Sequence, residues 1–360
     1  MDSTIAVIGL GYIGLPTAAV LARAGLDVIG VDVSDRHVDA VNRGELPFVE
    51  EGLGEVVAEV VKAGKLTATK QTPKADVYII AVPTPFAEGH KGDLSYIDAA
   101  TTAMAPQMEG DELVILESTS PPGTTEHVRE VLLAARPELT GVQFAHCPER
   151  VLPGRIMVEM VTNDRIVGGL TPEAAQRACD LYATFCEGTL HQTDAMTAEM
   201  AKLTENAFRD VNIAFANELS LISDRLGIDV WELIELANKH PRVNILQPGP
   251  GVGGHCIAVD PWFIVSSTPE EAQLIRTARE VNDAKPEWVV GQVRQAVEQL
   301  VAGGTQQPTV ACLGLAFKAD IDDLRESPSV GIVQTLAREL DQATVLAVEP
   351  NVDELPKNLA

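Results

Sequence analysis

The chain has 360 residues, enough for two or three domains with sizeable hydrophobic cores. Its formal net charge of −25 disfavours nucleic acid and anionic membrane surfaces as partners, because both repel an acidic protein at long range. There is no run of about 18 unbroken apolar residues to predict a transmembrane helix. The five scattered cysteines show neither a metal pattern nor a disulfide framework, and they fit a reducing cytoplasm best.

The N-terminal stretch carries the pattern of a dinucleotide-binding unit. A buried strand is predicted over 4–8, then a helix to about residue 24 and a second strand over 28–32. The turn after the first strand reads Gly9-Leu10-Gly11-Tyr12-Ile13-Gly14. Such glycines let a pyrophosphate approach the helix N-terminus, whose N–H groups and dipole attract an anion. A glycine turn in an unrelated α/β fold is the alternative.

An acidic residue at the end of the second strand selects the cofactor. Asp32 is placed to accept hydrogen bonds from a ribose diol and to repel a 2′-phosphate, so the cofactor is predicted to be NAD. The nearby Arg36 keeps NADP as the alternative.

Further strands are predicted over 76–82, 113–116 and 144–146, and polar residues follow each of them. Ligands of doubly wound sheets lie beyond the carboxyl ends of the strands, so one crevice is expected to collect Thr84, Thr119 and Glu149. Turn and capping chemistry is the alternative for these residues. Residues 1–196 are therefore predicted to form an α/β domain with a Rossmann-like, doubly wound parallel sheet.

A long helix is predicted from residue 197 to about 225. Lys202, Asn206 and Arg209 fall on one face of it, beside an apolar stripe. Such a polar line is usually a solvated face, but a substrate-facing role is favoured in a chain that already carries a nucleotide-binding pattern.

The stretch 247–260 reads Gln-Pro-Gly-Pro-Gly-Val-Gly-Gly-His-Cys-Ile-Ala-Val-Asp, and its glycines and prolines predict a loop. A thiol on such a backbone is presented to a ligand, and basic neighbours lower the pKa of a thiol, so Cys256 is a candidate nucleophile. Asp260 follows closely, and His240 and Arg242 precede the loop. A structural loop with a buried, inert cysteine is the alternative.

Two more helices are predicted, over about 269–281 and 287–301, which complete a central helical region from 197 to 302. After a linker at 303–308, strands over 309–313 and 343–348 flank a helix at about 329–340. Two strands and one helix are too few for an independent sheet domain, so residues 303–360 are expected to be an incomplete α/β nucleotide-binding lobe, truncated or completed by another chain.

The thiol loop resembles the signature of the nucleotide-sugar 6-dehydrogenases, and its His-Cys-Ile-Ala-Val-Asp form resembles the branch that acts on UDP-N-acetylmannosamine. The likeness extends over the whole chain. It includes the turn at 9–16, Pro83-Thr-Pro, Glu117-Ser-Thr-Ser-Pro, Cys147-Pro-Glu-Arg-Val-Leu-Pro-Gly, Lys202-Leu-Thr-Glu-Asn and Gly314-Leu-Ala-Phe-Lys with Arg325-Glu-Ser-Pro.

The resemblance implies roles for individual residues. Cys256 matches the catalytic cysteine, and Lys202 matches a lysine that acts as general acid/base or stabilises an oxyanion. The matches to substrate contacts are Asn206, Arg209, His240, Arg242, Arg150, Val151, Gly253 and Lys318. The matches to cofactor contacts are Tyr12, Ile13, Asp32, Thr84, Thr119, Arg279 and Arg325.

The chain departs from the UDP-glucose branch at two positions. That branch typically reads Pro-Glu-Phe-Leu, then one residue and a second glutamate, whereas Arg150 and Pro153 stand here in place of the phenylalanine and that glutamate. Any role of the missing carboxylate then passes to Glu149, Asp260 or water. The family also has a C-terminal lobe that is longer by about 60 residues.

The implied reaction is an NAD-dependent, four-electron oxidation of a UDP-sugar to a uronate, through a thiohemiacetal and a thioester on Cys256. The family implies a homodimer. The same chemistry on UDP-N-acetylglucosamine or UDP-glucose, a two-electron hydroxyacid dehydrogenase, and a truncated form that binds NAD without turnover are the alternatives.

Overall fold

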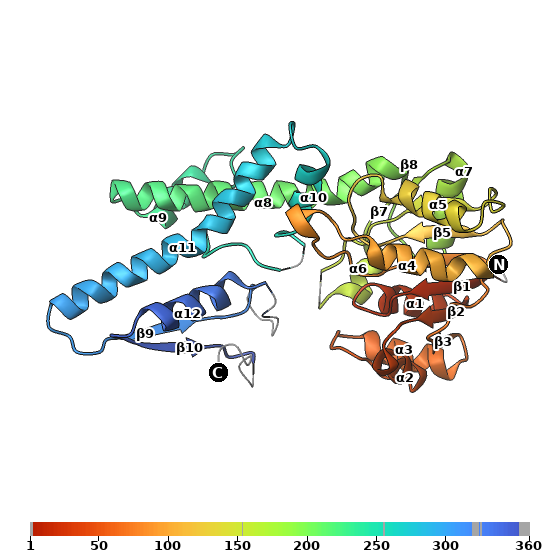
Figure 1. The fold of residues 1–360 in the computed structure, drawn as a ribbon, viewed down its shortest axis with the longest axis horizontal. Coiled ribbons are helices and arrows are strands. Elements are labelled where there is room, and N and C mark those ends of the chain that lie inside the picture. The colour runs from red at the N-terminus through yellow and green to blue at the C-terminus, as the bar shows by residue number, and fades with distance from the viewer. Residues whose placement is uncertain (1–2, 153, 255, 319–323, 325, 353–360) are drawn as a thin grey trace. The chain divides into compact units, whose positions relative to one another are not determined.

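The computed structural model describes residues 3–152, 154–254, 256–318, 324 and 326–352. The chain divides into two compact units, Met1–Leu203 and Thr204–Ala360. The long helix α8 (Ala195–Leu226) begins in the first unit and ends in the second (Figure 1).

The first unit is built on an eight-stranded sheet with the order β3-β2-β1-β4-β5-β6-β7-β8. The strands are β1 (Thr4–Ile8), β2 (Asp27–Val31), β3 (Leu66–Thr69), β4 (Val77–Ile80), β5 (Leu113–Leu116), β6 (Gln143–His146), β7 (Arg165–Gly169) and β8 (Leu190–Asp194). All neighbours are parallel except β6 and β7. The chain order reverses between β1 and β4, which is where doubly wound sheets bind nucleotides. The predicted fold class is confirmed.

Helices cover both faces of this sheet (Figure 1). They are α1 (Gly14–Arg23), α2 (Asp35–Asn42), α3 (Leu53–Lys62), α4 (Ser95–Met104), α5 (Thr124–Ala135), α6 (Ile156–Thr162) and α7 (Pro172–Tyr182), with short 3-10 turns at Glu88–His90 and Ala105–Gln107. Alternate residues of β1 point to opposite faces, so Ile5 and Val7 pack under α1, α3 and α7, while Ala6 and Ile8 pack under α4 and α5.

The second unit combines helices with a small sheet. Its elements after α8 are α9 (Val230–Ala237), α10 (Asp260–Ser267), α11 (Gln273–Ala302), β9 (Thr309–Leu313), α12 (Pro328–Glu339) and β10 (Thr344–Val348). Both strands were predicted for the last segment of the chain, and the structure shows that β9 and β10 pair in parallel. Val290 and Val297 of α11 are buried with Ile332 and Leu336 of α12, so the small sheet is anchored on the second half of α11.

The prediction of two helices over 269–281 and 287–301 is wrong. The structure has one helix of 30 residues, α11, with Pro286 inside it. A proline inside a helix removes one intrahelical hydrogen bond, but the helix continues where packing compensates for that loss. Here the apolar contacts of α11 with α12 lie just beyond the proline, and α10, which was not predicted, also packs on α11.

Within the described ranges, no helix combines the length and the hydropathy that a bilayer crossing requires.

Candidate active site

The glycines of the turn after β1 have different surroundings: two of them have no room for a side chain, and the third is open. Gly9 has φ +97°, and a Cβ there would lie 2.4 Å from the carbonyl oxygen of Ala81; a Cβ on Gly14 would lie 1.8 Å from that of Gly9. A Cβ on Gly11 would meet no atom of the described residues within 4 Å. The backbone therefore does not explain Gly11, whereas close approach of a pyrophosphate to the N-terminus of α1 does.

Asp32 is connected to this turn. Its Oδ2 accepts from the backbone N–H of Leu10 at 2.9 Å and lies 3.2 Å from Nδ1 of His37, and its Oδ1 accepts from the N–H of Ser34 at 2.8 Å. A carboxylate offers about four acceptor positions, so this one can still accept from a ribose hydroxyl. The exposed Arg36 donates from Nη2 to the carbonyl of Pro47 at 3.0 Å.

Two threonines follow β4 and β5 at the same edge of the sheet. Thr84 Oγ1 is buried and has no hydrogen-bond partner among the described residues, as expected of a group that bonds to a ligand. Thr119 is partly exposed. Ser118 holds the two segments together, because its Oγ donates to the carbonyl of Val82 at 2.8 Å and accepts from the Val82 N–H at 2.9 Å.

The remaining predicted residues of the turn fit a dinucleotide as well. Tyr12 is 44% exposed and its ring lies 4.3 Å from that of Phe48, while Ile13 is partly exposed at the start of α1. The open position at Gly11 and the unpartnered Thr84 hydroxyl thus agree with NAD as the group that this edge holds.

A buried carboxyl at this edge was missed by sequence reasoning. Glu117 is 2% exposed; its Oε2 accepts from Oγ1 of Thr17 on α1 at 2.9 Å, and its Oε1 accepts from the hydroxyl of Tyr182 on α7 at 2.6 Å. Burial raises the pKa of Glu117 to about 7; the neighbouring carboxylate of Glu149 adds to the rise, and the guanidinium of Arg165 opposes it. The segment 117–119 is therefore held in place on both sides. Glu117 bonds to α1 and Ser118 bonds to the loop after β4, and together they position Thr119, a predicted cofactor contact.

Glu149 lies in the same interior. Its Oε2 accepts from Nη2 of the buried Arg165 at 3.0 Å, and its Oε1 accepts from the N–H of Arg150 at 2.7 Å. Glu149 is only 8% exposed and is already ion-paired with Arg165. Its catalytic role stays a prediction.

Arg150 and Val151 follow directly. Arg150 donates from Nη1 to the carbonyl of Asp164 at 3.1 Å and borders a cavity of about 360 Å³, and Val151 packs partly buried against Val20 and Met160. The cavity is otherwise lined by Asp164, Ile166, His191, Thr193, Thr197 and Ala201.

In the second unit, α8 and the thiol loop meet at a polar contact. Asn206 donates from Nδ2 to Oδ2 of Asp260 at 2.5 Å. Asp260 is 3% exposed at the start of α10, and its N–H donates to the carbonyl of Cys256 at 2.9 Å. Lys202 is half-buried and Arg209 is exposed on the same helix. Three predicted catalytic residues, Asn206, Asp260 and Cys256, are thus brought together.

Cys256 is the exposed cysteine of the five. Cys147 and Cys179 are buried, and Cys186 and Cys312 are intermediate. Burial raises the pKa of the Cys147 thiol to about 12, which keeps it protonated and inert. The alternative of a buried structural cysteine at position 256 does not hold.

The loop glycines serve packing within the chain. A Cβ on Gly253 would lie 2.6 Å from the carbonyl oxygen of Glu326, and one on Gly254 would lie 2.9 Å from the ring of Phe317. Gly251 has φ +145°, and a Cβ there would meet Pro328 at 2.9 Å. The loop therefore lies against the C-terminal segment, a role that the sequence did not predict; the substrate contact of Gly253 stays a prediction.

The remaining predicted contact residues of the second unit form no hydrogen bond, among the described residues, with Asn206, Asp260 or Cys256. His240, Arg242 and Lys318 are exposed, and Nδ1 of His240 accepts from the N–H of Arg242 at 3.3 Å. Arg279 was predicted to contact the cofactor, but it is 1% exposed and its guanidinium donates to Asp210 at 2.6 Å, so the structure places it inside the α8–α11 helix pair. Arg325 lies outside the described residues.

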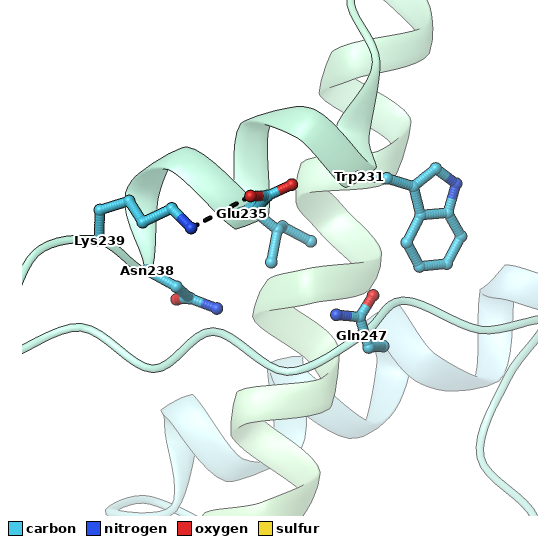
Figure 2. Close-up of a pocket in the computed structure, with 6 residues that line it drawn as sticks. Trp231, Glu235, Asn238, Lys239 and Gln247 are labelled. Carbon is cyan, nitrogen blue, oxygen red and sulfur yellow. Dashed lines mark hydrogen bonds and ion pairs between the residues drawn. The ribbon is translucent and has the colours of Figure 1, made fainter.

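A second cavity, of about 420 Å³, contains none of the predicted site residues (Figure 2). It is lined by Trp231, Ile234, Glu235, Asn238, Lys239 and Gln247. Lys239 donates to Glu235 at 3.1 Å across its wall (Figure 2).

Three domains of one family match the chain. The NAD binding domain of the UDP-glucose/GDP-mannose dehydrogenase family matches residues 3–186, its central domain matches 196–284 and its UDP binding domain matches 311–360. NAD as cofactor is confirmed.

Individual proteins agree with these matches. The chain is 58% identical to the UDP-N-acetyl-D-mannosamine dehydrogenase of Salmonella typhi over 99% of this chain and 88% of the relative. It is 56% identical to the NDP-N-acetyl-D-galactosaminuronic acid dehydrogenase of Ralstonia nicotianae over 99% and 85%. The structure of UDP-D-ManNAc dehydrogenase from Pyrococcus horikoshii is similar with a TM-score of 0.90 at 42% identity, over 97% of this chain and 84% of that one. The chain belongs to the UDP-glucose/GDP-mannose dehydrogenase family.

Proposed function

We propose that this enzyme oxidises UDP-N-acetyl-D-mannosamine to UDP-N-acetyl-D-mannosaminuronate. The relatives at 57–58% identity carry the name of that dehydrogenase, and the thiol loop has the matching His-Cys-Ile-Ala-Val-Asp form. The observation that carries the chemistry is the exposed Cys256 on a loop joined to Asn206 through Asp260.

The reaction removes four electrons from one carbon. A bound NAD would supply the hydride acceptor for each of the two oxidations, so two NADH are expected per sugar. After the first oxidation the Cys256 thiolate adds to the aldehyde, forming a C–S bond and an oxyanion. The same carbon then loses its second hydride to give a thioester, and addition of water breaks the C–S bond to release the carboxylate and the thiol. The covalent bond keeps the aldehyde from escaping.

The polar residues of α8 face the charge that develops. Lys202 and Asn206 stabilise the alkoxide of the first step and the oxyanion of the thiohemiacetal, and Lys202 also exchanges the proton of the sugar hydroxyl. Asp260 orients Asn206 and the hydrolytic water, with Glu149 as the second candidate for the water.

An acidic protein needs local positive charge to bind a nucleoside diphosphate. Arg150, Arg209, Arg242 and Lys318 supply it, and Val151, His240 and Gly253 complete the substrate contacts in this proposal. Arg325 remains a proposed cofactor contact, whereas Arg279 is 1% exposed and ion-paired with Asp210, so it is left out of the proposed cofactor site.

We further propose a cytoplasmic homodimer without nucleic-acid or membrane partners, divided into domains 1–196, 197–302 and 303–360. The five free thiols fit a reducing compartment. The dimer is supported by an apolar row on α8, where Phe208, Phe215 and Ile222 recur every seven residues and are 70%, 52% and 43% exposed.

A direct test offers NAD with UDP-N-acetylmannosamine, UDP-N-acetylglucosamine, UDP-N-acetylgalactosamine and UDP-glucose to the wild-type chain, Cys256→Ala and Cys186→Ala. We expect two NADH per UDP-N-acetylmannosamine from wild type and from Cys186→Ala, which controls for loss of a thiol. Cys256→Ala should form no uronate while its NAD affinity is retained. Uronate at the wild-type rate from Cys256→Ala would refute the nucleophile, and one NADH per sugar from wild type would refute the four-electron reaction.

The galactosamine substrate is the second candidate, because the Ralstonia nicotianae relative at 56% identity is named for a galactosaminuronic acid. A higher kcat/KM for UDP-N-acetylgalactosamine would select it.

A further inference from the structure

A buried chain of hydrogen bonds runs from α8 and α11 to the loop that presents the thiol. Asn217 on α8 accepts at Oδ1 from the N–H of Gly249 at 2.9 Å. Its Nδ2 donates to Oδ1 of Asn282 at 2.8 Å, and Nδ2 of Asn282 donates to Oδ1 of Asp210 at 2.8 Å. Arg279 closes the chain by donating to the same carboxylate at 2.6 Å.

The direction of these hydrogen bonds is determined at both ends. The Gly249 N–H can only donate, so Asn217 turns its carbonyl toward the loop, and the Asp210 carboxylate can only accept, so Asn282 turns its amide nitrogen toward it. No other orientation of the two amides satisfies both ends. All four side chains of the chain are 0–1% exposed, so each lost bond would leave a polar group unpaired away from water.

The thiol loop is therefore held at two points by one face of α8. Asn206 and Asn217 are eleven residues apart (217 − 206), close to three turns of about 3.6 residues, and so lie on the same face. Asn206 reaches Asp260 just after the thiol, and Asn217 reaches Gly249 before it. Between these points the glycines at 251, 253 and 254 pack against Pro328, Glu326 and Phe317.

We propose that Asn217 is a positioning residue for Cys256, held in its orientation by Asn282, Asp210 and Arg279. Its buried side chain contacts neither substrate nor cofactor in this proposal. Its hydrogen bond to Gly249 fixes the position from which the loop runs to Cys256. The proposal rests on the function of Cys256 as nucleophile, and it gives Arg279 a structural role in place of a cofactor contact.

The decisive comparison is between Asn217→Ala and Asn212→Ala. Asn212 lies on the same helix and donates to the Phe208 carbonyl of that helix, so its loss does not reach the loop. In Asn217→Ala we expect the alkylation rate of Cys256 by iodoacetamide, followed by peptide mass spectrometry, to change at least about fivefold, while NAD affinity stays within about twofold. We also expect NADH per sugar to fall from two toward one, with aldehyde captured by hydroxylamine.

Wild-type values of both the alkylation rate and the product ratio in a folded Asn217→Ala would overturn the proposal. Should that variant not fold, amide exchange in the unaltered chain decides: the Gly249 N–H should exchange more slowly than that of Val252 on the same loop, and equal rates would contradict the contact. If wild type makes no uronate, the proposed function fails, while alkylation and amide exchange still test Asn217.

Discussion

Two cysteines with opposite environments show how burial distinguishes an inert thiol from a candidate nucleophile. Cys147 lies directly after β6 with no exposed surface, and burial raises its thiol pKa to about 12. Cys256 is exposed on the glycine-rich loop. Thiolate chemistry at neutral pH requires an accessible thiol, and Cys256 has such an environment.

Glu117 should make stability depend on pH. Its pKa rises from 4.5 in the unfolded chain to about 7 in the folded one, so between these values the folded state holds a proton that the unfolded state has released. The free energy of unfolding should therefore fall as pH rises through this window, by roughly 3 kcal/mol from this group. Denaturant unfolding from pH 4.5 to 8 should show that Glu117→Gln lacks this part of the slope, while Glu130→Gln, an exposed change on α5, keeps it. Parallel curves for wild type and Glu117→Gln would contradict the assignment.

In the turn between β1 and α1, two glycines are required by the fold and a third is open to a ligand. Gly9 and Gly14 are required by the backbone, and Gly11 faces open space. The three glycines of this pattern therefore have different roles, two in the packing of the backbone and one in leaving space for a ligand. The sequence alone does not show which glycine has which role.

Gly11→Ala should weaken NAD binding with little effect on stability. Its methyl group meets no atom in the part of the chain that the structure describes, but it enters the space over the N-terminus of α1. We therefore expect at least about a tenfold rise in Kd by fluorescence titration and a change in unfolding free energy below about 1 kcal/mol. Gly14→Ala is the matched comparison and should destabilise the fold by several times as much, because its methyl overlaps the Gly9 carbonyl. Unchanged NAD affinity in Gly11→Ala would refute the role of the open position.

The prediction that two chains form a dimer rests on the apolar row on α8, which consists of Phe208, Phe215 and Ile222. Phe215 is 52% exposed near the middle of that row. Phe215→Asp should place a charge in the interface and shift sedimentation from dimer to monomer, since a buried unpaired charge opposes association. Glu130→Ala, an exposed change on α5 that does not belong to the row, is the control. A monomeric wild-type chain, or a variant that stays dimeric, would count against this face.

Much of the site was predictable because local pattern determines it. The strands at 4–8 and 113–116 have the predicted bounds, and the lysine, asparagine and arginine of α8 share the predicted face. Asn217 was missed, although its spacing of three turns from Asn206 was a usable signal. Pro286 misled the prediction of α11, because its effect depends on apolar contacts with α12 that are remote in sequence.

The strand and helix periods, the glycine turn with its acid, and the cysteine loop could be inferred from the order of the amino acids, since each depends on residues within one element or one turn. Three features required the folded chain: the accessibility of Cys256, the burial of Glu117 beside Arg165 and Tyr182, and the pairing of Arg279 with Asp210. The physical reason is that burial and hydrogen-bond partnership depend on groups 65 to 69 residues apart in the chain, such as Glu117 with Tyr182 and Arg279 with Asp210, and no local pattern encodes those distances.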